Sequence, residues 1–236
     1  SDKTGTLTQN KMKVMKYYTL NNLNEVDDNN EINNPDSIKL VQGMSSHTED
    51  GVTTSFLIAN SSDLTAMQTY VAGGGGFLGA KFKLAADITS SITDPIGTAS
   101  SDEKTTSYGL PFCGSFDGDN KTITLTGSRS TDVNYNGLFG YIKSASISNL
   151  KVNYNSTSVI NINSTVASGG VVGIAKYSTL SNVSVTTSQN GIASDSGKTG
   201  GLIGYAESTK INTSAGEISS FTGKLTGNSY VGGITG

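Results

Sequence analysis

The 236-residue chain has no tryptophan, one cysteine, one histidine, one arginine and three prolines. The single cysteine, Cys113, excludes an internal disulfide framework and a zinc site built from cysteines. Charged residues make up 15% of the chain, and the formal net charge is −3. Nucleic-acid binding needs clustered lysine and arginine, so this composition argues against a nucleic-acid partner. No run of residues approaches the roughly 20 apolar positions that a membrane-spanning helix needs.

Glycine occurs 29 times, and serine, threonine and asparagine replace much of the missing charge. Disordered chains usually combine high net charge with few β-branched residues, whereas this chain has little net charge and abundant valine, isoleucine and threonine. We therefore expect many short strands joined by tight turns. The chain starts at Ser1 without a methionine and stops at Gly236 inside a repeat, so we expect targeting and anchoring segments to lie outside it.

Two short motifs recur in phase through the C-terminal part of the chain. The first places two hydrophobic residues between glycines, and its leading glycines lie 33, 31 and 32 residues apart. The glycines of the four copies are Gly137, Gly140, Gly170, Gly173, Gly201, Gly204, Gly233 and Gly236. The second motif, a hydrophobic residue followed by Ser-Asn and another hydrophobic residue, places Asn149 and Asn182 at one repeat position.

A single repeat of this length cannot bury its own apolar side, but stacked repeats can. The sequence therefore predicts an all-β fold, a right-handed parallel β-solenoid over residues 137–236. A β-propeller has a period of this order, but its blades need about 40–50 residues. Stacked coils would align Asn149 and Asn182 as a ladder of hydrogen-bonded amides, and the alternative is that both are turn residues.

The residues before the repeats divide into two segments. Residues 53–136 predict a small N-terminal α/β cap, which a solenoid needs to protect its edge from pairing with other chains. Its helix is expected at Asp63–Val71, with Ser61 or Ser62 as N-cap and Gly73–Gly76 at its end. Residues 1–52 form the other segment, which we expect to be disordered or irregular because residues 17–52 are rich in asparagine and aspartate.

Residues 53–236 resemble the GLUG-repeat family of bacterial surface proteins. The matching motifs are Phe-Leu-Ile at 56–58, Phe-Lys-Leu at 82–84, Pro-Ile-Gly-Thr at 95–98, Gly-Ser-Phe-Asp-Gly at 114–118 and Gly-Leu-Phe-Gly at 137–140. The resemblance implies a β-solenoid in a cell-surface or secreted, adhesin-like protein. It implies no enzymatic activity for the repeats.

Residues 1–16 resemble a different family, the P-type cation-transporting ATPases, through Asp-Lys-Thr-Gly-Thr-Leu-Thr at positions 2–8. The resemblance implies that Asp2 accepts a phosphoryl group from ATP, that Lys3 contacts the phosphate and that the Thr4 carbonyl binds Mg²⁺. The chain has no Gly-Asp-Gly-x-Asn-Asp or Thr-Gly-Glu motif to complete that machinery. We interpret the segment as a short ATPase-like end joined to a repeat protein; the alternative is a fragment or fusion of a P-type ATPase.

Parallel β-helices also carry polysaccharide lyases and hydrolases, which need clustered carboxylates. From Gly137 onward the carboxylates are Asp195, Glu207 and Glu217, at different repeat phases, so we expect no shared site. Asp117 and Asp119 with Asn120 suggest calcium, but their spacing fails the EF-hand loop and fits a turn.

Six tyrosines either line a carbohydrate-binding face or stack structurally: Tyr135, Tyr141, Tyr154, Tyr177, Tyr205 and Tyr230. Tyr141 and Tyr205 share a repeat position, and we expect them to stack.

These patterns predict a non-enzymatic fragment of a bacterial cell-surface or secreted repeat protein, acting in adhesion or as a structural stalk. The expected partner is a host or matrix glycan or protein, with no cofactor and no metal. A lyase or hydrolase predicts a carboxylate cluster on one face, and an ATPase predicts Mg²⁺ and ATP at Asp2.

Overall fold

A computed structural model of the chain describes the following residues: 16–19, 22–25, 46–49, 52–99, 109–127, 129–130, 133–154, 166–187, 191–194 and 197–236. The chain forms two compact units, Ser1–Gln42 and Gly43–Gly236. In the first unit, β1 (Lys16–Thr19) pairs with β2 (Asn22–Glu25) in antiparallel fashion. The expectation of an irregular segment up to residue 52 is thus corrected at these strands, where Tyr17 and Tyr18 favour extended backbone.

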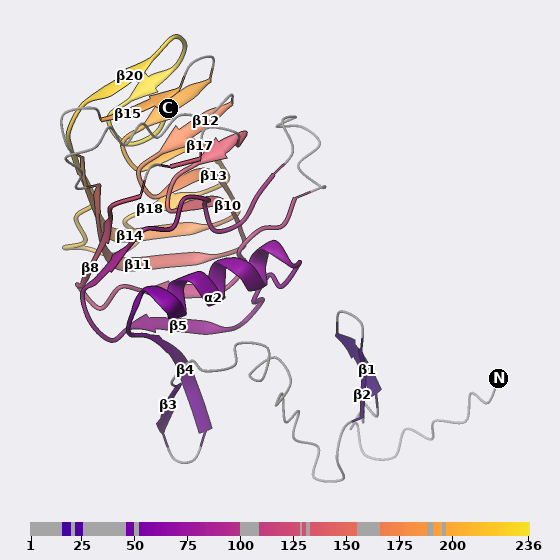
Figure 1. Cartoon of the computed structure of the whole chain (residues 1–236). Helices are drawn as coiled ribbons and strands as arrows, with labels where there is room; N and C mark the ends of the chain where they lie inside the picture. The colour runs from indigo at the N-terminus through magenta and orange to yellow at the C-terminus, as the bar shows by residue number, and fades with distance from the viewer. Residues whose placement is uncertain are drawn as a thin grey trace. The chain divides into compact units, whose positions relative to one another are not determined.

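The second unit is a parallel β-solenoid of about four turns, which confirms the predicted solenoid class (Figure 1). Sheet 1 is the longest, in the order β18 (Lys210–Ile211), β14 (Thr179–Thr187), β11 (Ser146–Tyr154), β7 (Ser115–Asp117), β5 (Lys81–Leu84), β4 (Val52–Ile58) and β3 (Ser46–Glu49). Three further strands join it at the sides, β6 (Ile88–Ser90), β8 (Thr122–Leu125) and β19 (Ser220–Thr222).

Three smaller sheets complete the coils. Sheet 2 contains β10 (Phe139–Lys143), β13 (Val172–Lys176) and β17 (Ile203–Glu207). Sheet 3 contains β9 (Tyr135–Asn136), β12 (Ala167–Gly169), β16 (Lys198–Gly200) and β21 (Val231–Gly232). Sheet 4 pairs β15 (Ile192–Ser194) with β20 (Leu225–Gly227). All the strand pairs within these three sheets are parallel, as stacked coils require.

The core consists of columns of apolar side chains that repeat from coil to coil in register. One column in sheet 1 runs Phe82, Phe116, Ile147, Leu180 and Ile211. All of these except Ile211, which lies in the last coil, are buried. Since residues paired in a parallel ladder point to the same face, each coil buries the apolar side of its neighbour.

The N-terminal end of the stack carries the predicted helix, α2 (Ser61–Ala72), whose Leu64, Met67 and Val71 are buried. Its N-cap is Asn60, which corrects the expected Ser61 or Ser62. The Asn60 side chain accepts a hydrogen bond from the Asp63 amide at 3.1 Å, and the Asp63 carboxylate accepts one from the Asn60 amide. This reciprocal capping box satisfies two amides at once, which a serine N-cap one position later would not do.

The stacking of coils starts before the first glycine repeat. β4, β5 and β7 already pair in parallel, and β3 pairs with β4 in antiparallel fashion at the outer edge. The compact unit that contains the cap begins at Gly43, and the cap shares sheet 1 with the repeats. We attribute this to residues 81–84 and 115–117, which match the register of the repeats without carrying their glycine motif.

The repeat glycines lie where two backbones approach each other. A Cβ built on Gly170 would lie 2.5 Å from the carbonyl oxygen of Gly201 in the next coil, and one on Gly173 would lie 2.8 Å from the amide nitrogen of Asn136. Both distances are too short for real carbon atoms, so any side chain here would force the coils apart. Similar backbone contacts surround Gly137, Gly140, Gly201, Gly204 and Gly236, whereas Gly233 has no heavy atom within 4 Å.

Candidate functional site

An asparagine ladder runs along one corner of sheet 1. Asn149, Asn182 and Asn212 all have left-handed backbones, with φ of 51°, 54° and 54°. Asparagine tolerates this conformation better than other residues with side chains. The Asn182 amide Nδ2 donates to Asn149 Oδ1 at 2.9 Å, and Asn212 Oδ1 accepts from the Asn182 backbone amide at 3.1 Å. The predicted ladder is therefore present, and Asn149 and Asn182 occupy left-handed positions inside β11 and β14 instead of turns.

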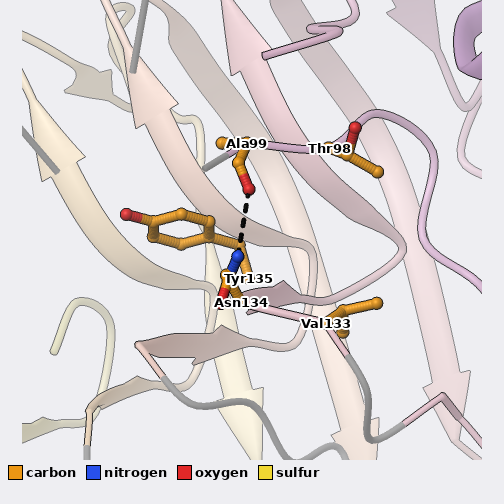
Figure 2. Close-up of a pocket in the computed structure, with 5 residues that line it drawn as sticks. All are labelled: Thr98, Ala99, Val133, Asn134 and Tyr135. Carbon is orange, nitrogen blue, oxygen red and sulfur yellow. Dashed lines mark hydrogen bonds between the residues drawn. The ribbon is translucent and has the colours of Figure 1, made fainter. Parts of the chain in front are cut away.

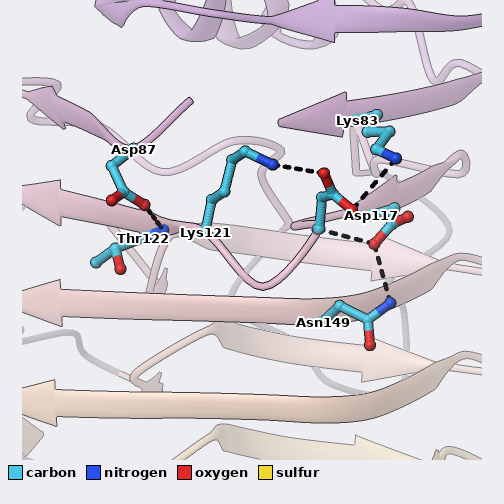
Figure 3. Close-up of polar contacts among 7 residues, drawn as sticks. Lys83, Asp87, Asp117, Lys121, Thr122 and Asn149 are labelled. Carbon is cyan, nitrogen blue, oxygen red and sulfur yellow. Dashed lines mark hydrogen bonds and ion pairs between the residues drawn. The ribbon is translucent and has the colours of Figure 1, made fainter. Parts of the chain in front are cut away.

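The ladder ends in a charged network at its N-terminal side (Figure 3). Asn149 Nδ2 donates to Asp117 Oδ1 at 3.0 Å, and Asp117 also accepts from the Asp119 amide at 2.9 Å. Asp119 forms ion pairs with Lys121 at 2.5 Å and Lys83 at 3.2 Å. The hydrogen bond from Lys121, followed by that from Lys83, lowers the pKa of the Asp119 carboxyl below its ordinary value.

This network neutralises its own charge instead of presenting an acidic pocket. Asp87 is also engaged, because its Oδ1 accepts from the Thr122 amide at 2.6 Å (Figure 3). Across the part of the chain that the structure describes, no group of three or more histidine, cysteine, aspartate or glutamate side chains is arranged to hold a metal ion. Asp119 and Asn120 have positive φ, which fits the expected turn.

A second polar column lies within sheet 2. Lys143, Lys176 and Glu207 are in register, and the buried Lys176 ammonium lies 2.8 Å from the Glu207 carboxylate. Tyr177 donates its hydroxyl to Glu207 at 3.2 Å. Burial opposes the charge of Lys176, but the hydrogen bond and charge of Glu207 together outweigh it and raise the pKa of Lys176. The same hydrogen bond from Lys176 lowers the pKa of Glu207.

The carboxylates considered for a lyase or hydrolase do not form a described site. Glu207 is engaged by Lys176 and Tyr177, and Glu217 accepts from the Ser214 amide at 2.9 Å. Asp195 lies outside the residues that the structure describes, as do Asp2, Lys3 and Thr4 of the ATPase-like motif.

The six tyrosines separate into buried and surface side chains. Tyr135, Tyr141 and Tyr154 are buried, while Tyr177 and Tyr230 are exposed and Tyr205 is half-buried. The expected stacking of Tyr141 on Tyr205 is wrong. In the register of sheet 2, Ile174 lies between them, because the two tyrosines belong to coils that are not adjacent.

A small cavity of about 150 Å³ lies beside Tyr135 (Figure 2). It is lined by Thr98, Ala99, Val133, Asn134 and Tyr135, and Asn134 Nδ2 donates across it to the Ala99 carbonyl at 3.4 Å. Ligand pockets usually enclose about 300–1,000 Å³. The cavity is therefore too small for a sugar chain or a nucleotide.

Two buried polar side chains near the first repeat are structural. Arg129 donates to the carbonyls of Ile92, at 2.9 Å, and of Gly137. Tyr154 donates its hydroxyl to the Gly170 carbonyl at 2.7 Å, and burial raises its pKa to about 12. Sequence reasoning did not single out Arg129, and its position as the only arginine gave no signal of burial.

The outer face of sheet 1 carries a feature that sequence reasoning missed. We name it the hydroxyl column, and its members pair in register across five strands: Thr89, Thr124, Asn153, Thr186 and Thr222. Each is half-buried or exposed. The signal was present in the alternation Thr122-Ile123-Thr124, Ser184-Val185-Thr186 and Ser220-Phe221-Thr222, where the middle residue points inward.

In the part of the chain that the structure describes, no helix is long and apolar enough to cross a membrane. The chain matches no family model, no curated protein and no solved structure. Function must therefore be argued from the solenoid and its surfaces.

Proposed function

We propose that this chain is a non-enzymatic part of a bacterial cell-surface or secreted repeat protein of the GLUG type, in which the solenoid acts as an adhesive or structural stalk. The observation that carries the proposal is the in-register stacking of coils in sheet 1, from β4 to β18. A stack of this kind extends by adding coils, and each coil contacts only its neighbours. Such an architecture suits a spacer that presents a repeated surface.

The chemistry of the surfaces supports binding in preference to turnover. The carboxylates of sheets 1 and 2 are held by lysines or backbone amides, at Asp87, Asp119 and Glu207. A glycoside hydrolase needs two carboxyl groups facing one substrate, one of them able to donate a proton near neutral pH. The lowered pKa values of Asp119 and Glu207 are the reverse of what a general acid needs.

Surface location is tested by labelling intact cells that make the protein with a membrane-impermeant amine reagent. Lys151 and Lys210 are exposed, so we expect both to be modified before the cells are lysed. Modification only after lysis would contradict the proposal. Incubation with polysaccharides is the second arm, and we expect no release of reducing or unsaturated ends.

The ATPase-like segment is tested separately. Under the proposal, incubation with γ-labelled ATP and Mg²⁺ leaves no label on the protein. Labelling that disappears in Asp2→Asn would instead establish a phosphoenzyme and favour the P-type ATPase alternative.

A further inference from the structure

The hydroxyl column is a straight, regular array of short polar side chains. Strands in a sheet lie about 4.7–4.9 Å apart, so its five members repeat at that interval and span roughly 19 Å along the stack. Threonine is stiff at χ1, so four of the five side chains are held in few rotamers. The ladder register thus gives the column a fixed period that a flexible surface would lack.

The side chains of the hydroxyl column are available to a ligand. Within the part of the chain that the structure describes, none of Thr89, Thr124, Asn153, Thr186 and Thr222 makes a side-chain hydrogen bond to another residue. The asparagine ladder on the same sheet differs, because Asn149 and Asn182 bond to each other. The asparagine ladder therefore holds neighbouring coils together, whereas the hydroxyl column keeps hydrogen-bond donors and acceptors that a ligand can use.

A parallel column lies two residues away on the same face, and its members are Thr122, Lys151, Ser184 and Ser220. The charged residues of the two columns are Lys151 and Asp87, which extends the second column opposite Thr122. Their charges are opposite, so the two columns have little net charge with which to select an anionic polymer. The exposed large hydrophobic residues of the described chain lie elsewhere, at Leu78, Leu110, Tyr177, Ile218, Tyr230 and Val231. The face also lacks the aromatic and aliphatic anchors that protein partners usually need.

We propose that the outer face of sheet 1, along the hydroxyl column, binds an extended, uncharged, β-linked polysaccharide lying parallel to the stack. Such a chain is straight, carries hydroxyl groups on every sugar and repeats on nearly the same scale as the strands. Its hydroxyls can donate to and accept from Thr124, Asn153 and Thr186 in successive coils. The side chain of Lys151 lies beside the column. A single polysaccharide chain can pass this side chain, whereas the flat face of a polysaccharide crystal would be blocked by it. The inference rests on the proposed adhesive function and names its ligand class.

The test is electrophoresis of the whole chain through native gels containing hydroxyethylcellulose, an uncharged soluble β-linked glucan. We expect the glucan to retard the wild-type protein. The double variant Thr124→Val and Thr186→Val keeps β-branched side chains but removes two hydroxyls, and we expect its apparent affinity to fall about tenfold. The matched control is Thr65→Val, which removes an exposed hydroxyl on α2, outside the strands of sheet 1, and should bind like the wild type.

Three results would overturn the inference: no retardation of the wild type, unchanged retardation of the double variant, or stronger retardation by polygalacturonate that is lost in Lys151→Ala and in high salt. The last result would assign the face to an acidic polymer. Circular dichroism and urea midpoints verify that each variant is folded. Thr186→Lys, which adds a long charged side chain at an exposed position, gives a second disruption that does not depend on valine.

Failure of this inference is distinguishable from failure of the proposed function. A protein that is labelled on intact cells but not retarded by the glucan remains a surface stalk with another ligand. Release of reducing ends from the glucan would instead contradict the non-enzymatic function itself.

Discussion

The glycine corners and the hydroxyl column belong to the same coils but obey different constraints. Gly170 lies at the corner before β13, which we call the glycine corner, and Gly173 lies inside β13. A Cβ on either residue would collide with backbone atoms of a neighbouring strand or coil. On the outer face of sheet 1, Thr124, Asn153 and Thr186 pair in register, yet among the described residues their side chains make no hydrogen bond. The corner repeats its residue type because no alternative fits.

The comparison separates two reasons for repetition in a sequence. Glycine recurs at the corners for a steric reason, which any stack with this path would impose. Short polar residues recur on the outer face although solvent would accept many others. Repetition without a steric cause is therefore the better indicator of a binding surface, and the following variants test that distinction.

The largest effect is expected at the glycine corner. Gly170→Ala places a Cβ 2.5 Å from the Gly201 carbonyl, and we expect it to lower the free energy of unfolding by about 3 kcal/mol or more. Gly233 occupies the same repeat position but has no heavy atom within 4 Å of an added Cβ. Gly233→Ala should therefore change the free energy of unfolding by less than about 0.5 kcal/mol. Urea denaturation measures both. Equal effects would refute the steric explanation of the motif.

The next effect is expected at the ion pair between β13 and β17 of sheet 2. Glu207→Gln removes the carboxylate that pairs with the buried Lys176 side chain, and we expect the free energy of unfolding to fall by about 2 kcal/mol. Glu217→Gln, in an exposed loop, should lower the free energy of unfolding far less.

The same pair predicts a pH dependence with a definite sign. Because the pKa of Glu207 is lowered by folding, its contribution is present above the ordinary glutamate pKa and is lost as the pH falls through the folded value. Because the pKa of Lys176 is raised, its contribution is present below the ordinary lysine pKa and is lost as the pH rises through the folded value. Glu207→Gln should flatten the acid limb of the stability curve, and an unchanged limb would contradict this assignment.

The asparagine ladder should contribute less to the free energy of unfolding than the ion pair of Lys176 and Glu207. Asn182→Gly removes the amide but suits the positive φ, so we expect a loss of about 1 kcal/mol from the hydrogen bonds alone. Asn182→Ala adds the cost of a left-handed alanine, about 1 kcal/mol more. Chemical denaturation ranks the two variants, and an alanine variant as stable as the glycine variant would contradict the role of the backbone conformation.

Tyr154, which bonds to the Gly170 carbonyl, should make the stability of the protein depend on pH. Its hydroxyl donates to the Gly170 carbonyl, so Tyr154→Phe should cost about 1 kcal/mol. The folded pKa of about 12 lies above the ordinary value of 10.0, so the neutral form is favoured and stability should fall as the pH rises from 10 through 12. Thermal unfolding in this range should show a weaker pH dependence in Tyr154→Phe than in the wild type.

The smallest effect on stability is expected on the outer face. Thr186→Val should shift the free energy of unfolding by less than about 0.5 kcal/mol, since the side chain is exposed and valine keeps the preference for strand. A loss above 1 kcal/mol would show that the hydroxyl column holds the coils together, and would remove its contrast with the glycine corner.

The fold could be predicted from the sequence in the segments that carry the repeat motifs. The glycine spacing predicted the stacking of β10, β13 and β17, and the alternation around Asn149 and Asn182 predicted β11 and β14. The coils formed by β5, β7 and β8 share the register but not the motif, so their membership in the stack could not be read from the period.

The side-chain environments were less predictable. The capping of α2 by Asn60 depends on a reciprocal bond with Asp63, and a serine nearby looked equally suitable. The predicted stacking of Tyr141 on Tyr205 was wrong because two residues that share a repeat position need not lie in adjacent coils. The hydroxyl column was missed because its members vary between threonine and asparagine, so register, and not residue identity, makes them a column.

The register of sheet 1 is the central claim, and disulfide formation tests it most directly. In a Cys113→Ser background, Lys151→Cys and Ser184→Cys occupy paired positions of adjacent coils, at a strand spacing compatible with a disulfide. We expect this pair to crosslink within one chain under mild oxidation. The pair Ser146→Cys and Ser184→Cys is offset by five residues from the paired position, Lys151, and should stay reduced. Crosslinking of the offset pair, or none in the paired one, would contradict the parallel solenoid.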